Sequence, residues 1–213
     1  MMNEAGAGNG TVQPEIGAPH WRNPPPLFER HGDTLTVRTG EKTDFWNRTF
    51  YGFKNGNGHL LAHPVRGDFS AVAEFTADYR NLYDQAGIMV FVDDRIWLKA
   101  GTEFTDGAPH FSVVATREDQ SDWSMMPLPR DAGPARAVTM RVTRHGEAIR
   151  VQIKAGADWQ LARLAFLPMP ELVEVGPMCC SPTGAGLEVR FTRFEIGPPI
   201  SRELHPSASQ YPQ

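Results

Sequence analysis

Cysteine is nearly absent from this chain of 213 residues, which contains only Cys179 and Cys180. The two are neighbours in the sequence, and a disulfide between adjacent residues is strained. Two thiols alone are also too few for a structural zinc site. We therefore expect two reduced thiols in a strand, which is typical of a cytoplasmic protein. The sequence predicts no metal site and no cofactor.

Long apolar runs and clustered positive charge are absent as well. The longest apolar stretch, residues 86–92, is too short to span a bilayer. No positively charged start followed by an apolar stretch is present, so we expect no signal peptide. The net charge is -4, the isoelectric point is near 6.0, and there is no basic stripe. These features predict neither a membrane partner nor a nucleic-acid partner.

Large apolar side chains are rare at both ends of the chain. Residues 1–20 are rich in Gly, Ala, Pro and Glu, and residues 198–213 are rich in Pro and Ser. Such segments bury too little apolar surface to offset their ordering entropy, so both are predicted to be disordered tails. Residues 21–197 show no internal repeat and no linker, which indicates one domain.

The middle of the chain alternates short apolar segments with turn residues. The segments are rich in Val, Ile, Phe, Thr and Trp, which favour strands, and Gly, Asn and Asp punctuate them. About a dozen strands at this spacing predict an all-β sandwich or barrel. Residues 158–167 have a helix-like pattern closed by Pro168 and Pro170, and we predict a strand there as well.

Alternation along three consecutive segments assigns their faces, because successive side chains of a strand point in opposite directions. The predicted core set is Ala86, Ile88, Val90, Val92, Ile96, Leu98, Ala100, Phe104, Phe111, Val113 and Ala115. The other face mixes polar and aromatic side chains, which is the usual composition of a ligand groove.

From this second face we predict the binding residues. The central set is Tyr83, Gln85, Trp97, Lys99, Glu103 and His110, and the possible rim is Trp46, Tyr51, Asp122 and Trp123. Two plainer interpretations stay open. Charges such as Lys99 and Glu103 are common on the solvated face of an antiparallel sheet, and the tryptophans could be core residues.

A series of motifs gives the chain a family resemblance. The motifs are Thr43-Asp44-Phe45-Trp46, Tyr51-Gly52-Phe53, Asn57-Gly58-His59, Gly67-Asp68-Phe69, residues 82–87, residues 97–104, residues 112–117, Ser121-Asp122-Trp123-Ser124 and residues 175–182. Together they resemble the family named after the yeast "regulation of enolase" protein, over roughly residues 20–197. The resemblance implies a concanavalin A-like lectin/glucanase domain, a jelly-roll of two antiparallel sheets with one concave. It carries over no catalytic residue, and a fold alone does not give a function.

Signatures of several enzyme classes are missing. No Asp or Glu has a second acid two residues away, the spacing by which retaining glycosidases of this fold place both carboxylates on one strand. Carboxylates from separate strands, such as Asp84 and Asp122, could still pair. No Gly-rich phosphate loop and no Gly-x-Ser-x-Gly elbow occur.

Three functions stay open at this point. The first is a carbohydrate-binding, lectin-like domain with a small polar ligand on the concave sheet, because Gln85, Lys99 and Glu103 offer hydrogen bonds beside stacking aromatics. The second is a glycan-active hydrolase or lyase, and the third is a non-enzymatic interaction protein. We expect binding rather than catalysis.

Overall fold

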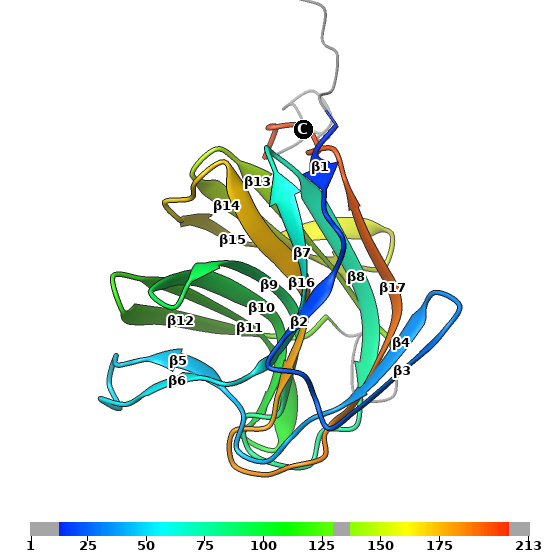
Figure 1. Cartoon of the computed structure of the whole chain (residues 1–213), viewed down its shortest axis with the longest axis vertical. Coiled ribbons are helices and arrows are strands. Elements are labelled where there is room, and N and C mark those ends of the chain that lie inside the picture. The colour runs from blue at the N-terminus through cyan, green and yellow to red at the C-terminus, as the bar shows by residue number, and fades with distance from the viewer. Residues whose placement is uncertain (1–12, 130–136, 205–213) are drawn as a thin grey trace, which may run out of the picture.

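The computed structural model describes residues 13–129 and 137–204, and within these ranges it contains seventeen strands and no helix. Most strands belong to two antiparallel sheets that face each other (Figure 1). The predicted all-β sandwich is therefore confirmed. Residues 158–167, with their helix-like pattern, form the expected strand, β15 (Asp158–Phe166).

The larger sheet has eight strands and carries the face predicted to bind ligand. Its members are β1 (Glu15–Ile16), β2 (His20–Arg22), β7 (His59–Arg66), β9 (Gln85–Asp93), β10 (Ile96–Thr105), β11 (Ala108–Arg117), β12 (Gln120–Pro127) and β16 (Leu172–Cys180). The order is β1-β7-β16-β9-β10-β11-β12, and β2 also pairs with β7. The sheet is curved in Figure 1, and a separate hairpin lies on its concave side.

The second sheet has seven strands and closes the sandwich. With β15 it contains β3 (Leu27–His31), β4 (Thr34–Arg38), β8 (Ser70–Ala77), β13 (Val138–His145), β14 (Ala148–Ala155) and β17 (Glu188–Gly197). The order is β15-β14-β13-β8-β17-β4-β3. The hairpin on the concave side of the larger sheet is formed by β5 (Phe45–Asn47) and β6 (Lys54–Gly56).

The core between the sheets follows the predicted alternation. Ile88, Val90, Leu98, Ala100 and Phe111 are buried in one apolar cluster, together with Val113. The register agrees, because Val90 opposes Leu98 and Ala100 opposes Val113. A shift of one residue would have exchanged the two faces.

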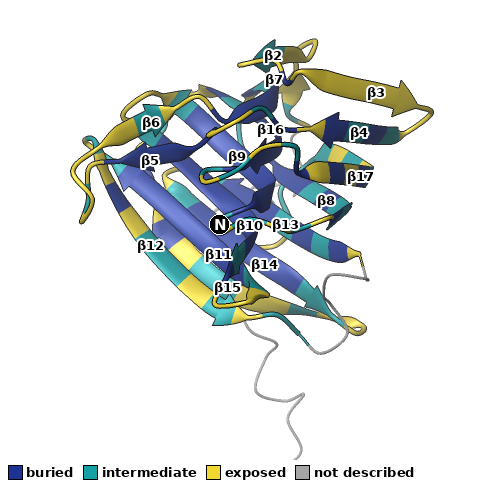
Figure 2. Cartoon of the chain, turned by 90° about the horizontal axis from the view of Figure 1, so that it is seen from below, coloured by how far each residue is buried: buried dark blue, intermediate teal, exposed yellow. Residues whose placement is uncertain are grey.

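Strands β9, β10 and β11 are apolar on their concave side too, at the end covered by the hairpin. Met89, Phe91, Trp97 and Val114 form a second cluster there with hairpin residues such as Phe45. The three strands are consequently buried on both faces over most of their length (Figure 2). An open sheet with one solvated face would have alternated between buried and exposed residues.

The predicted domain boundary between residues 20 and 21 falls inside a strand. β2 spans His20–Arg22, and β1, still earlier in the chain, pairs with β7 through Glu15 and Ile16. Edge pairing uses backbone N–H and C=O groups, so the scarcity of large apolar side chains in this segment did not prevent it. Residues 1–12 and 205–213 of the two predicted tails lie outside the described residues.

Phe111 tests the assignment of faces. Phe111→Ala should lower the free energy of unfolding by ~3–5 kcal/mol, because it leaves a cavity between the sheets. Chemical denaturation measures this change, with Leu164→Ala on β15, whose side chain is half exposed, as the control. If both variants lose equally little free energy of unfolding, the core assignment of Phe111 is wrong.

Candidate functional site

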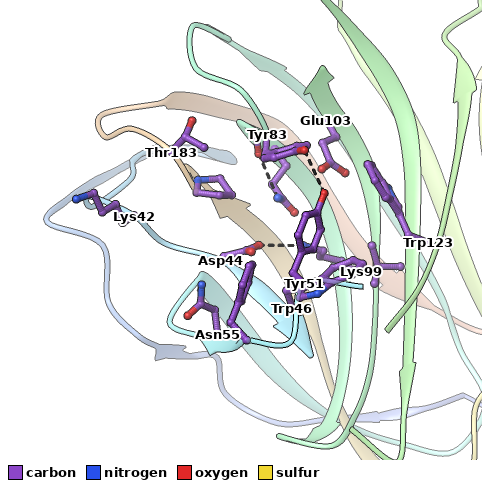
Figure 3. A pocket seen from close by; sticks show the side chains of 14 residues that line it. Lys42, Asp44, Trp46, Tyr51, Asn55, Tyr83, Lys99, Glu103, Trp123 and Thr183 are labelled. Atoms are coloured by element: carbon purple, nitrogen blue, oxygen red, sulfur yellow. Dashed lines mark hydrogen bonds and ion pairs between the residues drawn. The ribbon is translucent and has the colours of Figure 1, made fainter. Parts of the chain in front are cut away.

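A cavity of about 510 Å³ lies between the concave face of the larger sheet and the β5–β6 hairpin (Figure 3). Strands β9 to β12 supply its floor, and the hairpin and the loops before β5, before β9 and after β16 supply its walls. The lining residues are Lys42, Asp44, Trp46, Tyr51, Phe53, Asn55, Tyr83, Gln85, Lys99, Glu103, Val114, Trp123, Pro182 and Thr183. Its size is in the range that holds small organic ligands.

The hairpin is fixed over the sheet by hydrogen bonds at its far end. The Asn47 backbone N–H donates to Ser121 Oγ at 2.9 Å, and Asn47 Nδ2 donates to the Asp94 carbonyl at 2.8 Å. Lys54 adds an ion pair with Asp119 at 2.6 Å. These contacts hold β5 against the turns that flank β10 and β12, so the cavity is closed on that side.

A buried ion pair joins the start of the hairpin to the centre of the sheet. Lys99 Nζ on β10 lies 3.2 Å from Asp44 Oδ1, directly before β5, and both side chains are almost fully buried. Burial lowers the pKa of Lys99, but the opposing charges, chiefly Asp44, outweigh burial and leave this pKa raised. Asp44 Oδ1 also accepts the Phe45 N–H at 2.8 Å. Lys99 is therefore charged and held in place.

Glu103 is a second buried carboxyl on the same strand face. Burial raises its pKa above that of an ordinary glutamate, while Lys99 and the Ser112 hydroxyl oppose the rise. Ser112 Oγ donates to Glu103 Oε2 at 2.7 Å, and Trp123 Nε1 donates to the same Ser112 Oγ at 2.9 Å. The carboxyl group is thus positioned by a short chain of side chains from β11 and β12.

Aromatic rings form the walls above this polar floor. Trp46 lies edge-on to Trp123 at 6.3 Å between ring centroids, and to Tyr51 at 5.7 Å. Tyr83 meets Trp123 at 6.4 Å with an interplanar angle of 78°. Rings in these orientations present both faces and edges to the space between them, which suits stacking of a flat apolar surface.

The mouth of the cavity is spanned by two tyrosines. The hydroxyls of Tyr51 and Tyr83 lie 3.3 Å apart (Figure 3), and the Gln85 amide donates to the Tyr83 carbonyl at 3.1 Å. The hydrogen bond with Tyr51 raises the pKa of Tyr83 to about 12, so Tyr83 is neutral near pH 7. Tyr83 has a φ of 66°, a left-handed backbone conformation that is rare for a bulky residue.

Two glycines keep the floor free of side chains between the charged groups. Gly87 and Gly101 oppose each other across β9 and β10, and Gly101 lies between Lys99 and Glu103 on the same face. A Cβ on Gly101 would lie 2.0 Å from the Ala86 carbonyl oxygen, so no larger residue fits. Because Gly101 has no side chain, the floor between the Lys99 ammonium and the Glu103 carboxyl group stays open.

The structure brings most of the predicted binding residues to this one cavity. Those that line it are Tyr83, Gln85, Lys99 and Glu103 of the central set and Trp46, Tyr51 and Trp123 of the rim. Lys99 and Glu103 are only 5% and 6% exposed, so the interpretation as solvated charges is wrong. The hairpin covers them, and alternation along the strands gave no sign of this cover.

Three predicted residues lie outside the cavity. Trp97 is buried under the hairpin against Phe45, with ring centroids 6.1 Å apart. His110 lies near the start of β11, where its Nδ1 contacts the backbone carbonyl of Ala108 at 3.0 Å. Asp122 points to the other side of β12, where it pairs with Arg163 on β15.

The suggested pairing of Asp84 with Asp122 is not found. Asp84 is fully buried and accepts hydrogen bonds from the Ser181 hydroxyl at 2.6 Å and from the Asn81 N–H at 2.9 Å. These contacts tie together the loops before β9 and after β16. Asp84 is thus a structural residue, because it stabilises loops and does not line the cavity.

Asp44 is the most important residue that strand alternation missed. It precedes the hairpin, far from the three strands from which the site was predicted, and only its place in the Thr43-Asp44-Phe45-Trp46 motif singled it out. The other lining residues missed were Lys42, Phe53, Asn55, Val114, Pro182 and Thr183. Most of these come from loops or from the hairpin, whose position over the sheet depends on tertiary contacts.

Within the described ranges, no group of three or more His, Cys, Asp and Glu side chains is arranged to hold a metal ion. In the same part of the chain, no helix has the length and apolar character that crossing a membrane requires. Both thiols are buried and free of a disulfide, and burial raises the pKa of each.

A family model described as "Protein of unknown function (DUF1349)" matches residues 21–199, most of the chain. The chain belongs to the DUF1349 family. The chain is similar to "Regulation of enolase protein 1" of Saccharomyces cerevisiae. The two are 40% identical over 192 residues, which cover 90% of this chain and 95% of the relative. The resemblance inferred from the motifs is thereby confirmed.

Solved structures agree on the fold. The crystal structure of a functionally unknown protein from Saccharomyces cerevisiae has a TM-score of 0.80 and 40% identity, covering 86% of this chain and 97% of that one. A carbohydrate-binding module, CBM66 from Bacillus subtilis, has a TM-score of 0.51 at 10% identity, covering 83% and 94%. The second likeness shows the fold alone. This DUF1349 chain is a concanavalin A-like jelly roll, as predicted.

Lys99 tests the buried ion pair. Lys99→Met should lower the free energy of unfolding by ~3–5 kcal/mol, because it leaves the carboxylates of Asp44 and Glu103 buried without a counter-charge. The matched control is Lys42→Met, since Lys42 is largely exposed. Denaturation curves that show the same small loss for both variants would contradict the stabilising role of the pair.

Glu103 makes stability depend on pH. Its pKa is higher in the folded state than in the unfolded state, so the folded state binds the proton more tightly. The stability that this proton supplies at low pH is lost as the pH rises through the folded-state pKa. Glu103→Gln removes the titration, so the stability of the variant relative to the wild type should increase as the pH rises above about 4.3, the unperturbed pKa of a glutamate. Thermal melts across this range measure the difference, with Glu41→Gln as the exposed control. A difference that shrinks with rising pH would refute the raised pKa.

Proposed function

We propose that the protein binds a carbohydrate, or a similarly hydroxyl-rich small molecule, in the cavity under the β5–β6 hairpin. The observation that carries the proposal is the combination of aromatic walls with a charged, hydrogen-bonding floor in one enclosed space. Sugar rings have an apolar face that stacks on aromatics and hydroxyls that both donate and accept.

The polar floor can supply both halves of such hydrogen bonds. Lys99 is a donor, the carboxylates of Asp44 and Glu103 are acceptors, and the Gln85 amide is both. All four of these side chains are buried, and each is held by a neighbouring residue. A preorganised site loses less entropy on binding than a set of mobile surface side chains.

A glycan-active enzyme is the second candidate, and Glu103 is the observation that favours it. A carboxyl group with a raised pKa, sharing a cavity with a second carboxyl, is the arrangement by which glycosidases divide acid and base roles. Asp44 is committed to Lys99, however, so its carboxylate is already neutralised. We therefore favour binding without turnover.

We also propose that the protein works in the cytoplasm, with a small polar ligand as its partner. The two buried, unpaired thiols support this compartment, since oxidising compartments favour disulfides in place of free cysteine pairs.

A glycan array and calorimetry test the proposed function through Trp123. Trp123→Ala should weaken the binding of array-selected sugars by about 10-fold, because it removes one stacking wall and the hydrogen bond to Ser112. Trp159→Ala is the matched control, since Trp159 lies on β15 in the other sheet and contacts Arg141. If Trp123→Ala binds the sugars as tightly as the wild type does, the binding site lies elsewhere.

The same sugars also distinguish the three candidate functions. If they are cleaved, Glu103→Gln should abolish turnover while binding persists, because the amide keeps the shape without the proton chemistry. If a broad panel shows neither binding nor cleavage, the proposal fails, and the third candidate, an interaction protein, takes its place.

A further inference from the structure

The charged groups of the cavity are not balanced. Two carboxyl groups, Asp44 and Glu103, face one buried ammonium, Lys99. The second cationic side chain at the cavity, Lys42, is largely exposed, pairs with Glu41 and points away from the centre (Figure 3). Tyr83 adds no charge near pH 7, because its pKa is raised. An ionised Glu103 therefore gives the interior one more negative charge than positive charges.

The charge of Lys99 is already paired with a carboxylate. Its ammonium lies 3.2 Å from Asp44 Oδ1, and that contact ties the hairpin to the sheet. An acidic ligand would have to compete with Asp44 for Lys99 and would also meet the repulsion of Glu103 in a low-dielectric space. The site consequently disfavours carboxylate-bearing and phosphate-bearing ligands.

Glu103 keeps room for a ligand cation. An ionised carboxylate accepts about four hydrogen bonds. Among the described residues Ser112 Oγ donates one to Glu103, and Trp123 donates to that same hydroxyl. In Figure 3 the carboxylate points into the space between Tyr83 and Trp123. The faces of such rings carry partial negative charge and attract ammonium groups. A cation at this point would touch the carboxylate and the face of one of these rings, since the two rings meet edge to face with 6.4 Å between their centroids.

We propose that the cavity selects an amino sugar, whose protonated amine contacts Glu103 between Tyr83 and Trp123, over neutral and acidic sugars of the same ring. This inference rests on the proposed function and names its ligand class. The hairpin and the Tyr51–Tyr83 contact close the cavity on two sides.

Calorimetry with four pyranoses of similar shape tests the selection. The probes are glucosamine, N-acetylglucosamine, glucose and glucuronate, at about pH 6.5, below the pKa of an α-amino group. Glucosamine should bind about 3- to 10-fold more tightly than glucose or N-acetylglucosamine, and glucuronate should bind most weakly. Equal binding of glucosamine and glucose, or tighter binding of glucuronate, overturns the inference.

Two variants assign the selectivity to its residue. In Glu103→Gln glucosamine and glucose should bind with about equal affinity, because the amide has no charge to attract the amine. Glu41→Gln, which removes an exposed carboxylate near the mouth, should keep the preference. A preference that survives Glu103→Gln shows that another group receives the amine and overturns the inference.

Failure of this inference is separable from failure of the proposed function. Sugars that bind without any preference for the amine overturn the inference and leave the proposed function standing. If none of the four probes binds, the inference also fails, and the broader glycan array then decides whether the cavity is a carbohydrate site.

Discussion

The ion pair between Asp44 and Lys99 links the two parts of the molecule that make the cavity. Lys99 belongs to the middle strand of the concave face, and Asp44 belongs to the segment that leads into the hairpin. A buried lysine is costly unless a partner compensates it. Asp44 supplies that partner only when the hairpin lies over the sheet, so the charge and the position of the hairpin depend on each other.

The hairpin then changes the character of the whole sheet. Without it, the concave faces of β9, β10 and β11 would expose Met89, Phe91 and Trp97 to water beside the charged groups. With it, one end of the face becomes a second apolar core, and the other end becomes a closed space with polar groups on its floor. An open groove across a concave sheet has become a pocket, and a pocket favours small ligands over long ones.

Sequence patterns predicted the fold and about half of this site. Alternation assigned the faces of three strands correctly, because successive side chains point to opposite faces and the concave face carries polar residues that the core face lacks. It therefore identified Gln85, Lys99 and Glu103. It also included Trp97, because nothing in the strand pattern separates a residue facing a ligand from one facing a covering hairpin.

The residues missed share a physical reason. Asp44 and Phe53 come from segments whose contacts with the sheet are distant in sequence, and local periodicity carries no information on such contacts. The burial of Lys99 was hidden for the same reason, since its partner is 55 residues away. Motif resemblance did mark the segment around Asp44, but it did not say what that segment touches.

An NMR titration that follows the five tryptophan indole N–H signals of the chain tests most directly whether the cavity is a ligand site. If the cavity is the ligand site, glucosamine should shift the signal of Trp123 most, because its Nε1 donates to the Ser112 hydroxyl that binds Glu103. Trp46 should follow, and Trp21 and Trp159, which lie outside the cavity, should not move. Saturable shifts at Trp21 or Trp159 with none at Trp123 and Trp46 would show that the ligand binds outside the cavity.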